Sequence, residues 1–286
     1  MRSDIEIAAV VTNPDRPAGR KLEPRPPPVK LAAQRAGLDV LQPEKARDPS
    51  LAEHLERLHP DVATVVAYGK ILPASLLAIP RRGFVNLHFS VLPAYRGAAP
   101  VQRALMDGVS ETGASIMVLT EGMDEGPVLA TETVAVESEE TAGELGRRLA
   151  SVGAELLVPT LAAYVRGDLE PVAQDEAGAT YASKPSPEEA RIDWTAPAVT
   201  IHNLVRALNP SPVAWTTLRG ARLRVLRTRQ AADEELGPAE LAPDRAVVGA
   251  GGGALELVEV QPAGKRAMSG GDFVRGLRAA PGERFE

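Results

Sequence analysis

The sequence GFVNLHFSVLP, residues 83–93, is the starting point for the fold, because it contains a predicted strand and the loop that follows it. Residues 83–88 form the strand in this prediction. Further runs that are rich in β-branched and apolar residues predict strands at Ile5–Thr12, Asp61–Ala67 and Gly113–Leu119. The first part of the chain therefore offers four candidate strands for one sheet.

Helix-like segments separate these strands. They cover residues 29–36, 48–58, 99–106 and 141–165, and the last of them is long and rich in Ala and Leu. Strands that alternate with helices favour a mostly parallel sheet with helices on both faces. We therefore predict an α/β fold, with a Rossmann-like domain over residues 1–167.

The amino-acid composition of the chain changes after Gly167. Residues 168–187 contain few large apolar side chains and three prolines, which is typical of an interdomain linker. Residues 188–286 then begin with a predicted helix at 199–208, which short strands follow at 213–218, 221–228, 246–249 and 254–260, before a closing helix at 271–277. Short strands between glycine-rich turns predict a small OB-like β-barrel domain, a fold that commonly binds oligonucleotides.

The composition excludes several classes of protein. The 286 residues include no cysteine, which removes disulfides, thiolate metal sites and cysteine nucleophiles, and fits a reducing cytoplasm. No apolar run approaches the length of a membrane span, and the N-terminus has no signal-peptide profile. We predict a cytoplasmic protein that holds no metal and contacts no membrane.

The net charge of -6 argues against a general nucleic-acid binder, but basic residues cluster twice. Residues 16–30 hold five basic side chains and one acid, and residues 219–229 hold five arginines and no acid. Localised contacts with a polyanion and ordinary solvated surfaces explain these clusters equally well. In the second cluster, Arg222 and Arg224 share one face of a predicted strand, while Leu223 and Val225 point to the other.

Three side chains near residues 83–93 could perform chemistry. Asn86 and His88 are two residues apart, so an extended strand places them on one face. Ligands of open α/β sheets bind beyond the carboxyl ends of the strands, and Asp124 follows the next predicted strand. An amide can hold a carbonyl oxygen, an imidazole can move a proton, and a carboxylate can orient the imidazole. Taken singly, a histidine or an aspartate of this kind is more typical of a structural role.

In combination, these residues resemble the signature of the 10-formyltetrahydrofolate-dependent formyltransferases. Members of that family carry Asn-x-His, then Ser-Leu-Leu-Pro, and a later Asp; this chain has NLHFSVLP at residues 86–93 and Asp124. The resemblance implies formyl transfer from 10-formyltetrahydrofolate, with Asn86, His88 and Asp124 as the catalytic residues. It also implies contacts with the folate from two loops, through Ser90, Val91, Leu92 and Pro93 and through Tyr68, Gly69 and Ile71.

Other segments resemble the members of this family that formylate methionyl-tRNA. Residues 13–20 look like the loop that holds the tRNA acceptor end, and residues 95–100, 188–194 and 261–268 are similar to further stretches of the same proteins. The resemblance implies a monomer that acts on initiator methionyl-tRNA in translation initiation, with tRNA contacts from Arg16, Arg20, Lys21, Arg222 and Arg224. The alternative for the first loop is a proline-stiffened surface connection.

The start of the chain departs from the family. Members usually have a strand with a Gly-Thr-Pro turn, and a helix, before the strand at Ile5–Thr12, and this sequence has neither. We expect a start codon that was assigned too far downstream. Two rival functions stay open, namely a related formyltransferase or hydrolase of a small amine, and a non-catalytic tRNA-binding remnant. A nicotinamide enzyme is disfavoured, because no Gly-x-Gly-x-x-Gly follows a strand.

Overall fold

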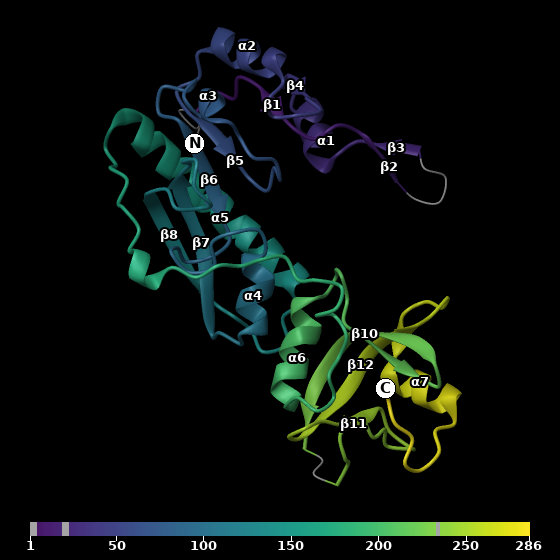
Figure 1. The fold of residues 1–286 in the computed structure, drawn as a ribbon. Coiled ribbons are helices and arrows are strands. Elements are labelled where there is room, and N and C mark those ends of the chain that lie inside the picture. The colour runs from purple at the N-terminus through teal and green to yellow at the C-terminus, as the bar shows by residue number, and fades with distance from the viewer. Residues whose placement is uncertain (1–4, 19–22, 233–234) are drawn as a thin grey trace. The chain divides into compact units, whose positions relative to one another are not determined.

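The computed structural model describes residues 5–18, 23–232 and 235–286 (Figure 1). The chain divides into two compact units. The first contains Met1–Arg96, Ala114–Glu132 and Ser151–Ala179, and the second contains Gly97–Gly113, Thr133–Ala150 and Thr180–Glu286. Each unit encloses its own cluster of buried apolar side chains.

The first unit is built on a sheet with the strand order β5-β6-β7-β8 and on a separate parallel pair, β1-β4. The strands of the sheet are Ala63–Val65 (β5), Phe84–His88 (β6), Glu111–Val118 (β7) and Val128–Ala135 (β8), and those of the pair are Val10–Val11 (β1) and Val40–Leu41 (β4). Strand β5 is parallel to β6, as the sequence predicts. The strand that we predict at residues 5–12 is reduced to β1, because the rest of that run has no ladder partner among the described residues.

Strand β7 runs antiparallel to β6, which our parallel interpretation of this segment does not anticipate. The register pairs Val85 with Val118 and His88 with Ser115. A parallel crossover needs a long connection whose helix packs on the sheet. Helix α4 (Pro100–Met106) connects these strands, but it packs on α6 (Ala198–Ala207) within the second unit. The chain therefore enters β7 beside the end of β6 and runs back along it.

Helix α5 (Ala142–Arg166) covers one face of the sheet (Figure 1). Leu161 and Tyr164 of α5 belong to the same buried cluster as Val85 and Leu87 of β6. Gly153 permits this close approach, because a Cβ atom there would lie 2.7 Å from Leu87 Cδ1. By length and composition α5 could cross a membrane, a test that the core helices of soluble proteins also pass. Leu161 and Tyr164 place one face of α5 against β6.

The remaining elements of the first unit are short. Helices α1 (Pro28–Arg35) and α2 (Pro49–Leu58) confirm two predicted helices, and α3 (Ala74–Leu77) adds a single turn. Strands β2 (Arg16–Ala18) and β3 (Glu23–Arg25) form an antiparallel pair within the segment that we predict as a loop. The predicted tRNA contacts Arg20 and Lys21 lie outside the described residues.

The second unit contains an antiparallel sheet with the order β11-β12-β10-β9, and β13 pairs with β12. Its strands are Trp215–Leu218 (β9), Ala221–Ala231 (β10), Val247–Gly249 (β11), Ala254–Pro262 (β12) and Met268–Ser269 (β13). Side chains alternate along β10, where Leu223 and Val225 are buried and Arg222 and Arg224 are exposed. The small β-rich domain that the sequence predicts is therefore confirmed, with its charged face as expected.

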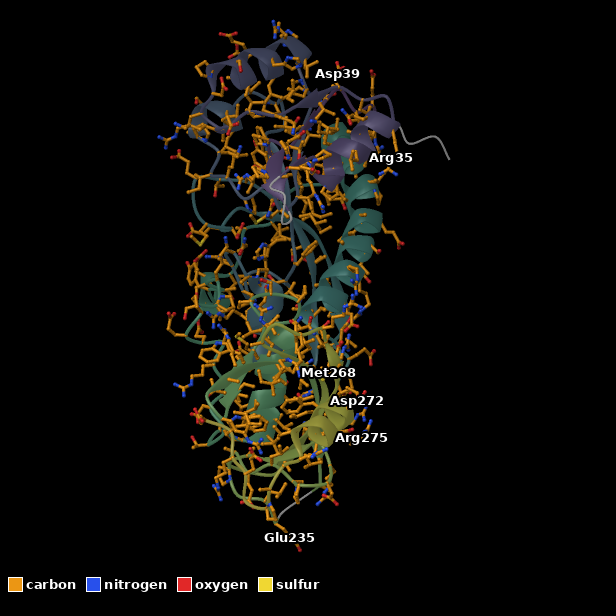
Figure 2. The ribbon with its side chains drawn as sticks, turned by 90° about the vertical axis from the view of Figure 1, so that its right-hand side faces the viewer. Arg35, Asp39, Glu235, Met268, Asp272 and Arg275 are labelled. Carbon is orange, nitrogen blue, oxygen red and sulfur yellow. The ribbon has the colours of Figure 1, made fainter. Side chains whose placement is uncertain are left out.

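Helix α7 (Gly270–Leu277) closes the second unit and shows how local sequence sets a helix boundary. Ser269 is the N-cap, and its hydroxyl oxygen accepts a hydrogen bond from the backbone N–H of Asp272. Asp272 also pairs with Arg275 one turn further along the helix (Figure 2). A serine cap followed three residues later by an acid is a recognised start signal for a helix.

A similar capping arrangement begins α5 and has a consequence for stability. Glu144 accepts hydrogen bonds from the backbone N–H and the hydroxyl of Thr141, and it also pairs with Arg227. The hydrogen bond from Arg227 and those from Thr141 lower the pKa of Glu144 to about 2. The carboxylate therefore stabilises the folded state above its unfolded pKa of about 4.5, and this contribution is lost as the pH falls towards 2.

We predict that Glu144→Gln lowers the free energy of unfolding by about 1 kcal/mol at pH 7, a value reduced for solvent screening because the side chain is 35% exposed. Urea unfolding at pH 7, 5 and 3 measures this difference, which should shrink as the pH falls. Glu155→Gln, at an exposed position of the same helix, is the control and should change stability little. A Glu144→Gln deficit that stays constant over this pH range would contradict the prediction.

Candidate active site

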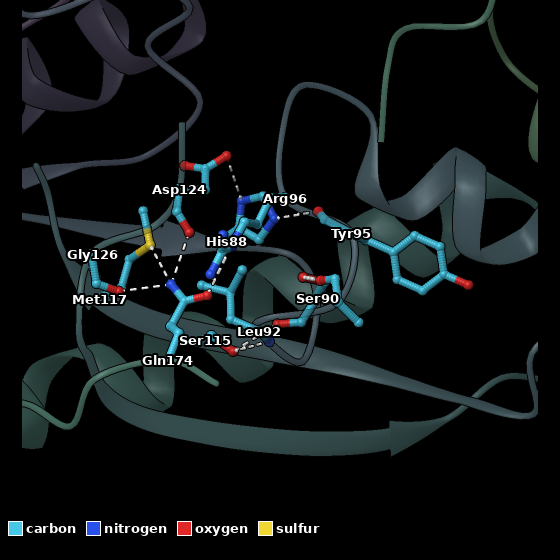
Figure 3. A network of polar contacts seen from close by, with 11 residues as sticks. His88, Ser90, Leu92, Tyr95, Arg96, Ser115, Met117, Asp124, Gly126 and Gln174 are labelled. Carbon is cyan, nitrogen blue, oxygen red and sulfur yellow. Dashed lines mark hydrogen bonds and ion pairs between the residues drawn. The ribbon is translucent and has the colours of Figure 1, made fainter. Parts of the chain in front are cut away.

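His88 is the last residue of β6, and its buried imidazole lies between two oxygen atoms (Figure 3). Nε2 is 2.8 Å from the carbonyl oxygen of Tyr95, and Nδ1 is 3.7 Å from Oδ2 of Asp124. A carbonyl oxygen only accepts hydrogen bonds, so Nε2 carries the hydrogen. In the neutral ring, Nδ1 is then the nitrogen with a free lone pair, and it faces the Asp124 carboxylate.

Asp124 reaches His88 by a route that differs from the predicted one. Because β7 is antiparallel to β6, it ends at Val118, beside the start of β6. The chain then folds back, with the Val118 N–H bonded to the carbonyl oxygen of Pro127. Gly126 allows this return, since a Cβ atom there would lie 1.7 Å from the Val118 carbonyl oxygen. Asp124 itself adopts a left-handed backbone conformation, with φ of 53°.

Asn86 lies on the same face of β6 as His88, as the spacing predicts. Val85 and Leu87, on the opposite face, belong to the core cluster that α5 covers. The Asn86 backbone is flanked by Val65 of β5 and Met117 of β7, and its side chain is half-buried. Its amide has no hydrogen-bond partner within the part of the chain that the structure describes, so its donors are available to a ligand.

The loop after β6 is fixed by two serine hydroxyls. Ser90 Oγ donates to the carbonyl oxygen of Ala94 at 2.6 Å. Ser115 Oγ lies 2.7 Å from the carbonyl oxygen of Ser90 and 3.1 Å from the backbone nitrogen of Leu92, and the Leu92–Pro93 peptide is cis. Ser90 and Leu92 are buried, whereas Val91 and Pro93 are half-buried. Of the predicted folate contacts in this loop, Val91 and Pro93 are therefore the accessible side chains.

The second predicted folate loop contains Tyr68, Gly69 and Ile71. The Tyr68 hydroxyl is buried without a hydrogen-bond partner among the described residues, and burial raises the pKa of this phenol. Lys70 lies over the Tyr68 ring and donates to the carbonyl oxygens of Pro43 and Glu44. Gly69 has a positive φ of 74°, and Ile71 is 89% exposed. This loop therefore contains one buried polar atom without a partner and one exposed apolar side chain.

The predicted tRNA contacts that the structure describes are exposed. Arg16 lies on β2, and Arg222 and Arg224 lie on β10. The Arg222 guanidinium stacks 4.1 Å from the centre of the Trp215 ring, and Arg224 is 3.4 Å from Gln261 Oε1. Three neighbours in the same cluster are neutralised by ion pairs, namely Arg219 with Glu283, Arg227 with Glu144 and Arg229 with Glu256. Arg222 and Arg224 have no acidic partner within the described ranges, so their charge remains available.

Three residues near the site are absent from the sequence-based prediction: Arg96, Ser115 and Gln174. Arg96 is fully buried, and Gln174 hydrogen-bonds to the carbonyl oxygens of Asp124 and Gly126 (Figure 3). Of these three, only Ser115 could have been noticed in the sequence. It is a small polar residue inside a buried strand, a position that favours a structural hydroxyl. In residues 5–18, 23–232 and 235–286, no group of three or more His, Cys, Asp or Glu side chains is placed to hold a metal ion.

Comparison with known proteins shows the family of this chain. The formyl transferase family matches residues 2–161, and the C-terminal domain of formyl transferases matches residues 184–278. A methionyl-tRNA formyltransferase of Streptomyces coelicolor is 48% identical over 98% of this chain and 91% of its own length. One from Acidothermus cellulolyticus is 45% identical over 100% of this chain and 94% of its own length.

A solved structure supports the fold at much lower sequence identity. HypX from Aquifex aeolicus in complex with tetrahydrofolic acid superposes with a TM-score of 0.65, at 18% identity, over 85% of this chain and 43% of that one. The catalytic fold, the second domain and the identity to full-length relatives agree with one another. The chain therefore belongs to the formyl transferase family, and within it to the methionyl-tRNA formyltransferases.

Proposed function

We propose that this chain transfers the formyl group of 10-formyltetrahydrofolate to the α-amino group of initiator methionyl-tRNA. The observation that carries the proposal is the half-buried, unpartnered Asn86 amide on the same strand face as His88, whose Nδ1 faces Asp124. Relatives with 43–48% identity over nearly the whole chain bear the name of this activity, which disfavours a small-amine substrate and a non-catalytic remnant.

The catalytic roles follow from which atoms are free. The Asn86 amide donates a hydrogen bond to the formyl oxygen as negative charge develops on that atom. Nδ1 of His88 takes a proton from the attacking amine, and the Asp124 carboxylate stabilises the imidazolium that results. A C–N bond forms to the methionine nitrogen, and the bond between the formyl carbon and the folate nitrogen breaks. The proton held by His88 passes to that leaving nitrogen, so the ring returns to its starting state.

The folate supplies the formyl group, and we propose that two loops hold it. Ser90, Val91, Leu92 and Pro93 would contribute backbone groups and the half-buried side chains of Val91 and Pro93. Tyr68, Gly69 and Ile71 would form the second side. The exposed Ile71 side chain supports this role, because ligand pockets are lined mainly by apolar groups.

Basic side chains would position the tRNA through its phosphates, which fix orientation without reading bases. We propose Arg16, Arg20 and Lys21 in the first domain, and Arg222 and Arg224 on β10. We also propose a catalytic domain over residues 1–167, a connection over 168–187 and a tRNA-binding domain over 188–286. The protein would act as a monomer in the cytoplasm.

We predict that His88→Ala lowers kcat for methionyl-tRNA formylation by about 10²- to 10⁴-fold, because the amine proton loses its acceptor. The affinity for methionyl-tRNA should change less than threefold. Single-turnover formylation and filter binding measure the two quantities. His54→Ala is the matched control, because His54 is a partly exposed histidine of helix α2; this variant should keep the parent kcat. Parent activity in the His88 variant would refute the proposed catalytic role.

We predict that replacing both Arg222 and Arg224 with alanine weakens tRNA binding and leaves the chemical step intact. The slope of log K against log salt concentration should become shallower by about 1.5, since each phosphate contact contributes roughly 0.7–0.9. Binding measured at several salt concentrations, together with kcat at saturating tRNA, tests this. Arg229→Ala is the control, because Arg229 lies on the same strand but is paired with Glu256. An unchanged slope in the double variant would exclude β10 from the tRNA contact.

A further inference from the structure

Residues 172–178 fall within the segment predicted as a linker, but they belong to the first unit and make specific contacts with the rest of it. Val172 and Val128 exchange two backbone hydrogen bonds of 2.8 Å, which form an antiparallel bridge. Asp175 caps the short helix η1 (Glu176–Gly178) through the N–H of Ala177. A Cβ atom at Gly178 would lie 3.2 Å from Cγ of Pro93. The segment therefore has a defined position beside the loop that follows β6.

Gln174, in the middle of this segment, uses both ends of its carboxamide. Its Oε1 accepts a hydrogen bond from Nε of Arg96 at 3.0 Å. Its Nε2 donates to the carbonyl oxygens of Asp124, at 2.8 Å, and Gly126, at 2.7 Å (Figure 3). The donor Arg96 and the two acceptors fix which end of the amide is oxygen and which is nitrogen. The side chain thus bridges a buried cation and the backbone of the loop that carries Asp124.

Arg96 is a suitable anchor for this bridge because its guanidinium is buried and pairs with Glu176. Its side chain is fully buried, and its two terminal nitrogens pair with both carboxylate oxygens of Glu176 at 3.0 and 2.8 Å. The hydrogen bond from Arg96 lowers the pKa of Glu176, as expected for a close ion pair. A buried guanidinium that lost its partners would be strongly destabilising. The preceding residue, Tyr95, supplies the carbonyl oxygen that holds His88.

The position of the Asp124 carboxylate depends in part on the backbone that carries it. At 3.7 Å from Nδ1 of His88 it makes no hydrogen bond to the ring that would fix its distance. Its residue has a φ of 53°, a left-handed conformation that aspartate adopts more readily than most residues but less readily than glycine. The backbone of residues 124–126 carries this carboxylate, and Gln174 holds the carbonyl groups of both Asp124 and Gly126.

We propose that Gln174 is a positioning residue for formyl transfer: it holds the loop of residues 124–126 so that the Asp124 carboxylate faces Nδ1 of His88. Gln174 touches no reacting atom in this proposal and acts only through Asp124. The inference rests on the proposed catalytic role of Asp124. It also assigns part of the predicted linker to the catalytic machinery of the first unit.

The test compares kcat and KM of the full-length chain with Gln174→Leu, Gln174→Glu and Asp124→Asn, and with each Gln174 change combined with Asp124→Asn. We expect both Gln174 variants to lower kcat by roughly 10- to 100-fold, the effect of a misplacement of about 1 Å, with KM for both substrates within twofold. In the Asp124→Asn background the same changes should lower kcat by less than twofold. Gln34→Leu, on the exposed side of α1, should retain the parent kcat.

Gln174→Glu separates positioning from a merely structural role. It keeps an oxygen for Arg96 but removes both donors to the loop, so restored activity in this variant would overturn the proposal. It also provides the comparison if the leucine variant fails to fold, which thermal unfolding would reveal. Losses that multiply with Asp124→Asn would equally overturn it. If Asp124→Asn itself leaves kcat unchanged, the proposed catalytic role of Asp124 fails, whatever the Gln174 variants show.

Discussion

The hydrogen bond from Nε2 of His88 to the carbonyl oxygen of Tyr95 determines what the rest of the candidate site can do. Because that oxygen can only accept, the bond places the hydrogen of a neutral ring on Nε2 and leaves the lone pair on Nδ1. The ring orientation is thus set by a backbone carbonyl. Asp124 is left to face Nδ1, the nitrogen to which we assign the proton transfer. The sequence suggests a carboxylate that orients the imidazole, and the structure shifts that task to Tyr95.

This arrangement requires unusual backbone on both sides of the ring. Tyr95 has a φ of 60° and Asp124 a φ of 53°, and a left-handed conformation costs roughly 1 kcal/mol or more in a residue with a Cβ atom. Polar contacts offset these costs locally. The hydroxyls of Ser90 and Ser115 hold the chain before Tyr95, and the Gln174 amide holds the chain around Asp124. The two strained residues therefore sit in a framework of hydrogen bonds that fixes them.

Local sequence patterns predict most of the fold, whereas the family resemblance singles out the three central residues. Period-two spacing places Asn86 and His88 on one strand face, and apolar patterning predicts α5 and the strands of the second unit. The direction of β7 is not visible in such patterns, because it depends on whether α4 packs on the sheet or on α6. Asp124 is therefore expected near His88 for a reason that does not hold, since its loop returns from the opposite end of the strand. Its proximity to His88 depends on tertiary structure.

The segment at residues 168–187 shows why composition alone misleads near a polar site. Low apolar content and prolines are typical of linkers, because a connection buries little surface. A strip of chain that packs beside a catalytic centre has the same composition for another reason, since its partners are carbonyl oxygens and a guanidinium. Gln174 and Glu176 both accept hydrogen bonds from Arg96, which lets this guanidinium be buried. Polarity in a connecting segment therefore indicates either solvent or a buried polar partner. Here the segment is polar because it contacts a buried polar partner, Arg96, which is close in space but distant in sequence.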